Sequence, residues 1–128
     1  MSPCPRAFVV DDEFAVRHSL ELLLSALGAT TQSYDRAEAF LAECQPNWTG
    51  VLFLDLRMPG MSGRELLVEM RDHPGDLSVI LMTGHADSES LVWAANEPDL
   101  IILEKPFSVI DLKSVLFDRY ANLFSGAA

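Results

Sequence analysis

Four short runs of unbroken apolar residues limit most strongly how this chain can fold. They are Phe8–Val10, Val51–Leu54, Val79–Met82 and Leu100–Leu103. An unbroken run, in contrast to an alternating one, is typical of a strand buried on both faces of a parallel sheet. The runs are bounded by Asp, Gly and Pro and are too short for buried helices. The pattern therefore predicts a parallel sheet covered on both faces, with the more polar Ala29–Tyr34 as an edge strand.

Segments with helical spacing of apolar residues separate these runs. The first extends from Val16 to Leu27, and Gly28 provides its stop. The second contains Ala39–Ala42, with Asp35 or Ser33 as the predicted cap. The third contains Leu66–Met70 after the Pro59-Gly60 turn, and the fourth contains Leu91–Ala95 before Pro98. The fifth contains Ile110–Leu123. Five repeats of strand and helix argue for a doubly wound α/β domain.

Length and composition narrow the class of protein further. At 128 residues the chain has room for one domain, and 49% hydrophobic with 22% charged residues is ordinary for a soluble globular protein. No apolar stretch is long enough to span a membrane, and the N-terminus lacks the apolar run of a signal peptide. We therefore expect a cytoplasmic protein, in which Cys4 and Cys44 are free thiols.

The charge balance argues against nucleic-acid binding by this chain. Nine basic residues stand against 19 acidic ones, giving a net charge of −10, and the only lysines are Lys105 and Lys113. Nucleic-acid binding normally requires a basic face. The acidity has two interpretations: a well-solvated surface, or in part a packed cluster of carboxylates that binds a cation.

Polar residues follow the predicted strands at the points where they end. Asp11-Asp12-Glu13, Asp55, Thr83-Gly84 and Glu104-Lys105-Pro106 each come after an apolar run. Ligands of such sheets bind at the carboxyl ends of the strands. Each residue alone has an ordinary explanation as a helix cap or turn residue, although Asp55 directly follows a run expected to be buried. Their combination at one sheet edge predicts a functional site.

The chemistry of such a site follows from its charges. Two like charges about 4 Å apart repel by about 4 kcal/mol at an effective dielectric constant of 20. A hard divalent cation with oxygen ligands, such as Mg²⁺, relieves this repulsion. An aspartate can also be the nucleophile that accepts a phosphoryl group, with a lysine and a hydroxyl to stabilise the phosphoryl oxygens.

Four motifs resemble those of the bacterial response-regulator receiver domain, and their wording is similar to the FixJ-like branch. They are Val9-Val10-Asp11-Asp12-Glu13, Leu54-Asp55-Leu56-Arg57-Met58-Pro59-Gly60-Met61-Ser62-Gly63, Thr83-Gly84-His85-Ala86-Asp87 and Glu104-Lys105-Pro106-Phe107. The resemblance implies a single receiver domain over 1–128, with a core of about 6–123. It also implies a five-stranded parallel sheet in the flavodoxin-like order 2-1-3-4-5, with helices on both faces.

The resemblance also implies a role for each matched residue. Asp55 resembles the phosphoacceptor, Thr83 the switch hydroxyl, and Lys105 the cation that pairs with the phosphoryl group. For Mg²⁺, which Mn²⁺ could replace, the implied ligands are Asp12, Asp55 and the backbone carbonyl of Arg57, with Asp11 acting through water. Pro106 is a candidate for a cis peptide bond. The Arg57 and His85 side chains resemble a pair that tunes loss of the phosphoryl group, or are exposed loop residues.

Three positions depart from the family pattern. Ile102 stands where relatives often have an aromatic residue that swings inward on activation, and Pro98 stands where many have Gly. Trp93 is larger than the residue usually found there. It is either partly buried against a neighbour or exposed as an anchor for a protein partner.

The resemblance implies a signalling switch in a two-component system, not a turnover enzyme. Its partner would be a histidine kinase or a histidine phosphotransfer protein, and a homodimer through the face of the fourth and fifth helices is a further possibility. The altered position Ile102 leaves open a phosphorylation-independent interaction module. A small phosphatase with an aspartyl nucleophile is disfavoured, because Arg57 stands where that class has a second acid.

Overall fold

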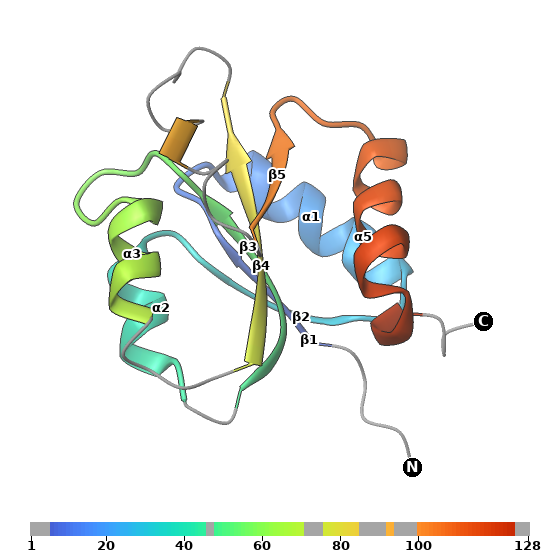
Figure 1. Ribbon diagram of the computed structural model, residues 1–128, viewed down its shortest axis with the longest axis horizontal. Coiled ribbons are helices and arrows are strands. Elements are labelled where there is room, and N and C mark those ends of the chain that lie inside the picture. The colour runs from blue at the N-terminus through green and yellow to red at the C-terminus, as the bar shows by residue number, and fades with distance from the viewer. Residues whose placement is uncertain (1–5, 46–47, 71–75, 85–91, 94–99, 125–128) are drawn as a thin grey trace.

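The sheet is parallel and five-stranded, as predicted, and its order is β2-β1-β3-β4-β5 (Figure 1). The computed structural model describes residues 6–45, 48–70, 76–84, 92–93 and 100–124; for residues 76 and 117–124 only the backbone is described. The strands are β1 (Arg6–Val10), β2 (Thr30–Tyr34), β3 (Thr49–Asp55), β4 (Asp76–Thr83) and β5 (Ile101–Glu104). The edge strand predicted at 29–34 is β2, which pairs with β1 alone.

Helices cover both faces of the sheet, which makes it doubly wound. They are α1 (Phe14–Ala26), α2 (Ala37–Glu43), α3 (Gly63–Met70) and α5 (Val109–Phe124). In Figure 1, α1 and α5 lie on one side of the strands, and α2 and α3 on the other. Of the fourth predicted helix only residues 92–93, which are helical, belong to the described part of the chain.

The unbroken apolar runs divide their side chains between two cores. In β3, Val51 and Phe53 belong to the core shared with α1 and α5, whereas Leu52 and Leu54 belong to the core shared with α2 and α3. All four side chains are fully buried. Successive side chains of a strand point to opposite faces, so a strand with a core on each side needs apolar residues throughout. The two cores on either side of β3 therefore confirm the prediction of a parallel sheet covered on both faces.

The end of α1 and the start of α3 follow local sequence signals. Gly28, with φ of 92°, ends α1, and the N–H groups of Gly28 and Ala29 donate to the carbonyls of Ser25 and Leu24 in a Schellman motif. At the start of α3, Ser62 and Glu65 form a capping box, with the Glu65 N–H donating to Ser62 Oγ at 3.2 Å.

The predicted cap of α2 is wrong. The N-cap residue is Arg36, and no side chain caps the helix. Asp35 instead accepts a hydrogen bond from Arg36 Nε at 3.0 Å, and Ser33 Oγ donates to the Glu21 carboxylate on α1. Both candidate caps therefore bind side chains instead of the backbone N–H groups at the start of α2.

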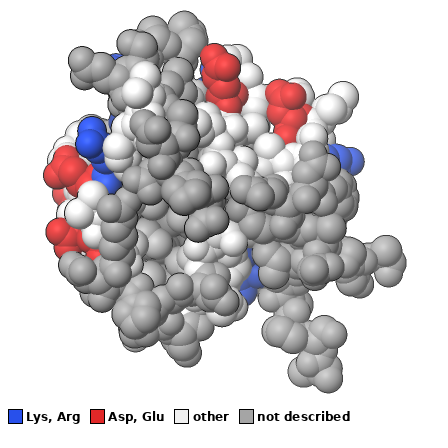
Figure 2. Space-filling model, viewed as in Figure 1, with Lys and Arg blue, Asp and Glu red and all other residues white. Residues whose placement is uncertain are grey.

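No helix in the described ranges is long and apolar enough to cross a membrane. On the face drawn in Figure 2, the blue basic side chains of the described residues form no continuous patch.

Candidate metal and phosphoryl site

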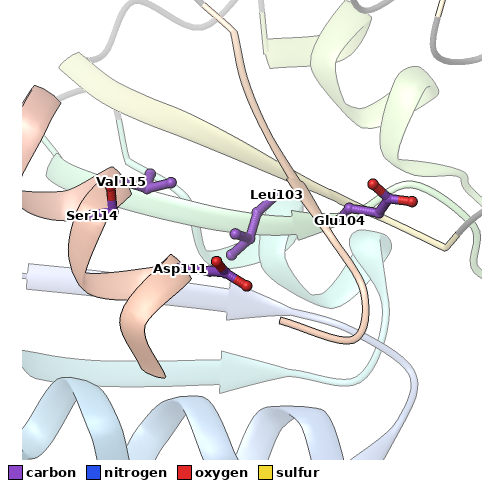
Figure 3. A pocket seen from close by; sticks show the side chains of 5 residues that line it. All are labelled: Leu103, Glu104, Asp111, Ser114 and Val115. Carbon is purple, nitrogen blue, oxygen red and sulfur yellow. The ribbon is translucent and has the colours of Figure 1, made fainter. Parts of the chain in front are cut away.

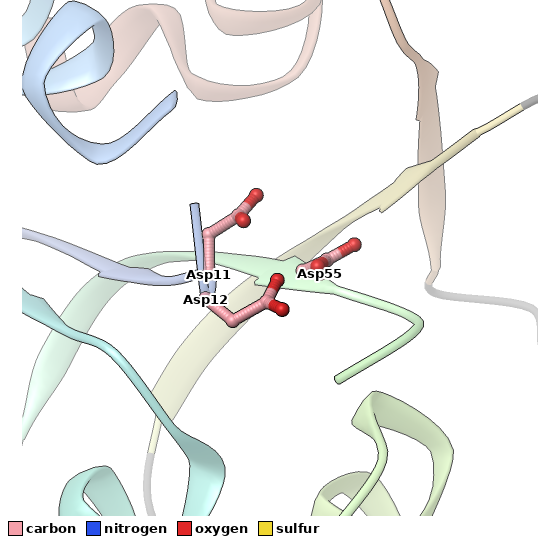
Figure 4. Close-up of side chains that lie close together, drawn as sticks. All are labelled: Asp11, Asp12 and Asp55. Atoms are coloured by element: carbon pink, nitrogen blue, oxygen red, sulfur yellow. The ribbon is translucent and has the colours of Figure 1, made fainter. Parts of the chain in front are cut away.

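The carboxylates of Asp11, Asp12 and Asp55 converge at the carboxyl ends of β1 and β3 (Figure 4). One oxygen from each lies within 4.8 Å of the others. β1 and β3 are neighbours with Val10 paired to Leu54, so the residues that follow these two come out side by side. The sheet register therefore brings together acids that are more than forty positions apart in the sequence.

Asp11 is fully buried, and its carboxylate has two partners. Oδ1 accepts the Glu13 backbone N–H at 2.9 Å, and Oδ2 accepts Lys105 Nζ at 2.7 Å. Asp12, by contrast, is exposed. The first acid of the pair is therefore a fixed part of the core edge, and the second is open to solvent.

Lys105 lies between the acids. Its Nζ is 2.7 Å from Asp11 Oδ2, 3.4 Å from Asp55 Oδ1 and 3.9 Å from Glu13 Oε1. The Lys105 N–H also donates to the Thr83 carbonyl at 2.6 Å, which attaches the segment after β5 to the end of β4. The Lys105–Pro106 peptide bond is cis, as the resemblance implies.

Burial and charge shift the protonation of this group of side chains. Desolvation, and then the negative charge of Asp11, raise the pKa of Asp55 from 3.8 to about 7. Burial by itself lowers the pKa of Lys105, but its hydrogen bond to Asp11 and the charges of Asp55 and Asp11 outweigh burial and raise it. Lys105 is therefore a permanent cation, whereas Asp55 is near its titration point at neutral pH when no metal is bound.

Thr83 ends β4 with an unused hydroxyl. The residue is 1% exposed, and its Oγ1 has no hydrogen-bond partner among the residues that the structure describes. A buried hydroxyl without a partner costs about 1–3 kcal/mol of desolvation. Such a group is suited to a ligand atom that supplies the missing acceptor.

Gly63 fixes the loop that follows Asp55. A Cβ at this position would lie 2.4 Å from the Asp55 carbonyl oxygen and 3.0 Å from Leu56 Cα. The Gly63 N–H also donates to the Leu56 carbonyl at 3.0 Å. The start of α3 is thus in direct backbone contact with the residue that carries the central carboxylate.

The remaining predicted residues differ in what the structure says of them. The Arg57 side chain is exposed, and the role of its carbonyl stays a prediction. His85 lies outside the described residues, as does Pro98.

Trp93 is partly buried, which was one of its two predicted alternatives. It packs with Ile102 against the core shared with α2 and α3, and the Arg64 guanidinium carbon lies 5.0 Å from its ring centroid. One face of the ring is therefore covered by this chain's own arginine. Whether Trp93 also anchors a partner stays a prediction.

A separate groove lies between β5 and α5 (Figure 3). It is lined by Leu103, Glu104, Asp111, Ser114 and Val115. Asp111 is already engaged, because its carboxylate accepts the Ser108 N–H at 3.1 Å at the start of α5. None of the predicted site residues lines this groove.

The acidic cluster fits a hard divalent cation. Its donors are carboxylate oxygens, which Mg²⁺ prefers. With Asp55 ionised, the three carboxylates and the Lys105 ammonium leave two negative charges, which one divalent cation balances. Asp12 and Asp55 would hold the ion; a role of Asp11 in binding its water shell stays a prediction, since both Asp11 oxygens already accept hydrogen bonds.

The strand order and the acidic cluster at the strand ends define a flavodoxin-like α/β domain with a polar site at the carboxyl edge of its sheet. Residues 7–117 match the response regulator receiver domain family, and the chain belongs to this family. It is a receiver domain of the kind found in bacterial two-component systems.

The relatives place the chain near FixJ. The transcriptional regulatory protein FixJ of Azorhizobium caulinodans is 42% identical over 99 residues, which cover 77% of this chain and 47% of that protein. The solved structure of full-length FixJ from B. japonicum has a TM-score of 0.83 at 32% identity, covering 98% of this chain and 62% of that one. For the structure of FixJ-N the values are 0.76 and 37%, with coverages of 90% and 92%. The chain spans about half the length of the curated FixJ relatives it matches.

Sequence reasoning missed two residues that support the site. Arg17 on α1 donates to the Asp11 carbonyl, and Gly63 contacts the Asp55 carbonyl. Gly63 is the last residue of the motif that begins at Leu54. Its role depends on the close approach of its backbone to the Asp55 carbonyl, which only the fold reveals. Arg17 follows Asp11 by six positions, and an arginine on the first turns of a helix is ordinarily a solvated residue.

Proposed function

We propose that this receiver domain is a phosphorylation-controlled switch that accepts a phosphoryl group on Asp55. The donor would be the phosphohistidine of a histidine kinase or of a histidine phosphotransfer protein. Mg²⁺, or Mn²⁺ in its place, would be held by Asp12, Asp55 and the Arg57 carbonyl, with Asp11 acting through water. The observation that carries the proposal is the placement of Asp55 between two further carboxylates and a half-buried lysine.

The chemical step is a transfer between two nucleophiles. An ionised Asp55 oxygen forms the new P–O bond while the P–N bond to the donor imidazole breaks, and the imidazole leaves with the electron pair of that bond. Mg²⁺, when bound, neutralises charge on the carboxylates and on the phosphoryl oxygens. The pKa of about 7 for Asp55 describes the metal-free protein, and positive charge at the cluster favours the ionised form that attacks.

Lys105 and Thr83 supply what the product needs. Lys105 Nζ is 3.4 Å from Asp55 Oδ1, so it is close enough to pair with a phosphoryl oxygen on that residue. The Thr83 hydroxyl is buried, unpartnered and at the end of the adjacent strand. Gaining an acceptor would remove its desolvation cost and would favour a population in which β5, α5 and the predicted fourth helix have shifted.

The test uses a small-molecule donor, so that no kinase has to be known. The protein is incubated with acetyl phosphate and Mg²⁺, and the intact mass is measured. We expect one added phosphoryl group, lost when EDTA replaces Mg²⁺ and absent in Asp55→Asn. Asp35→Asn is the matched control, because it removes an exposed carboxylate that follows the edge strand β2. Uptake by Asp55→Asn equal to that of the control would refute the assignment.

A phosphorylation-independent interaction module is the second candidate function. Ile102 packs with Trp93 in the apolar core, and an isoleucine cannot swing as an aromatic ring does. Beryllofluoride, a mimic of the phosphoryl group, separates the two functions. Binding of beryllofluoride that leaves Trp93 fluorescence and partner binding unchanged would favour the module.

The proposal extends to self-association. The predicted face of the fourth and fifth helices includes the exposed Val92 and Ile110, at 64% and 78% exposure. Light scattering with and without beryllofluoride measures whether the phosphorylated form dimerises. An unchanged mass in both conditions would exclude this extension.

A further inference from the structure

Arg17 holds the peptide that joins the two acids at the end of β1. Its side chain extends back from α1, and Nη1 donates to the Asp11 carbonyl oxygen at 2.7 Å. That oxygen belongs to the peptide whose N–H is contributed by Asp12. The hydrogen bond therefore fixes the plane from which the Asp12 side chain starts.

In the described part of the chain, the other hydrogen bonds of Asp11 and Asp12 are formed by Asp11. The Asp11 N–H donates to the Tyr34 carbonyl at 3.1 Å, and its carboxylate is held by the Glu13 N–H and by Lys105. The Asp12 carboxylate is exposed, and no hydrogen bond to it is found among the described residues. The orientation of Asp12 thus depends on its backbone, and hence on the hold that Arg17 has on the preceding carbonyl.

We propose that Arg17 is a positioning residue for the cation site: it holds the Asp11–Asp12 peptide so that the Asp12 carboxylate faces Asp11 and Asp55. This role rests on the proposed function, because it takes Mg²⁺ to be the cation that binds at Asp12 and Asp55. Arg17 contacts neither the cation nor Asp55, and it acts through the backbone.

The charge of Arg17 gives the test a clear sign. A guanidinium near three carboxylates repels an incoming cation, so on Coulombic grounds its removal should strengthen Mg²⁺ binding. If Arg17 positions Asp12, its removal should weaken Mg²⁺ binding instead. Partners that orient metal ligands typically change metal affinity by about 10- to 100-fold when they are removed.

Arg36 provides the matched control. It is exposed, and its Nε is 3.0 Å from Asp35. Hydrogen bonding by Arg36, together with the charges of Arg36 and Arg17, holds the pKa of Asp35 below its usual value, so both arginines lie near the same exposed acid. Arg36→Met and Arg17→Met therefore remove the same charge from the same region, but only the second removes the contact to the Asp11 carbonyl.

The experiment measures two quantities on the whole chain. Calorimetric titration gives the Mg²⁺ dissociation constant. Amide hydrogen exchange by NMR in EDTA reports the Glu13 N–H, which is bonded to Asp11. For Arg17→Met we expect Mg²⁺ binding about tenfold weaker than in Arg36→Met. We also expect several-fold faster exchange at Glu13, with unchanged exchange in the middle of α1 and an unchanged urea midpoint.

Each outcome separates this role from the proposed function. Unchanged Glu13 exchange, or Mg²⁺ binding as tight as in Arg36→Met, overturns the positioning role. If the wild-type chain binds no Mg²⁺ while Glu13 exchange still accelerates, the proposed cation function fails and the hold on the peptide stands. Should Arg17→Met not fold, Arg17→Lys keeps the charge without the planar guanidinium and is expected to change both quantities in the same direction.

Discussion

Asp55→Asn is expected to stabilise the metal-free protein at neutral and higher pH, although it removes the central residue of the site. The Asp55 carboxyl is 5% exposed, and burial with the charge of Asp11 raises its pKa to about 7. In the unfolded chain it ionises near 3.8. Folding therefore forces this group to take up a proton, or to bear its charge in an unfavourable place, at any pH between these values.

The size of the expected stabilisation follows from the difference between the folded and unfolded pKa values of Asp55. Because the folded pKa is raised, the contribution of Asp55 to stability is present in full below about pH 4 and is lost as the pH rises to about 7. The loss is about 1.4 kcal/mol per pH unit and about 4 kcal/mol in total. Asparagine stays neutral, as the protonated carboxyl does, and therefore avoids this loss; the attraction of Lys105 for the carboxylate is already part of the shifted pKa. At pH 8 the variant should therefore be more stable by about 4 kcal/mol.

The assay is urea unfolding in EDTA at several values between pH 4.5 and 8. The difference in unfolding free energy between variant and wild type cancels the titration of all groups that the two share. Glu69→Gln, an exposed residue of α3, is the control for loss of one negative charge. A difference that stays flat across this range would refute the reasoning, because a pH-independent gain cannot come from a raised pKa.

The other substitutions test single contacts. Thr83→Val should raise the free energy of unfolding of the unphosphorylated protein, measured with urea, by between zero and about 2 kcal/mol, because it removes a buried hydroxyl that has no partner among the described residues. The same variant should abolish any fluorescence response to beryllofluoride. A clear loss of stability would show that the hydroxyl is already bonded. Gly63→Ala should lower stability by about 2 kcal/mol or more, since its Cβ would meet the Asp55 carbonyl at 2.4 Å; Gly84→Ala, with open space around it, is the control. Lys105→Met should cost about 3–5 kcal/mol in EDTA, because the fully buried Asp11 loses its cation, and Mg²⁺ should restore most of it; equal stability with and without Mg²⁺ would contradict this.

The sequence was sufficient for the fold because its main signal is physical and local. A strand with a core on each face needs an unbroken apolar run, and β1, β3, β4 and β5 all contain one. β2 lies at the edge and is more polar, and it was accordingly the weakest of the five predicted strands. The predicted cap of α2 failed because Asp35 and Ser33 bind side chains of Arg36 and Glu21 instead of the helix end.

The site was predictable in its residue types but not in its contacts. The rule that parallel strands end at one edge of a sheet predicts that Asp11, Asp55 and Lys105 lie together. It could not say that Asp11 is fully buried whereas Asp12 is exposed, because that depends on how the chain turns into α1. The role of Arg17 is not predictable for the same reason: its partner is a backbone carbonyl, which a sequence motif does not encode.

The hydrogen bond between Lys105 and Asp11 joins residues 94 positions apart, and this bears on the order of events in folding. A contact of this separation forms only after most of the chain has been brought into register, because the entropy of closing long loops is paid first. The cation site is therefore a late product of folding. An ion that binds the completed site stabilises contacts that the rate-limiting state lacks, so it should slow unfolding while leaving the folding rate nearly unchanged. A two-state chevron recorded with and without Mg²⁺ would show this as a shift confined to the unfolding limb.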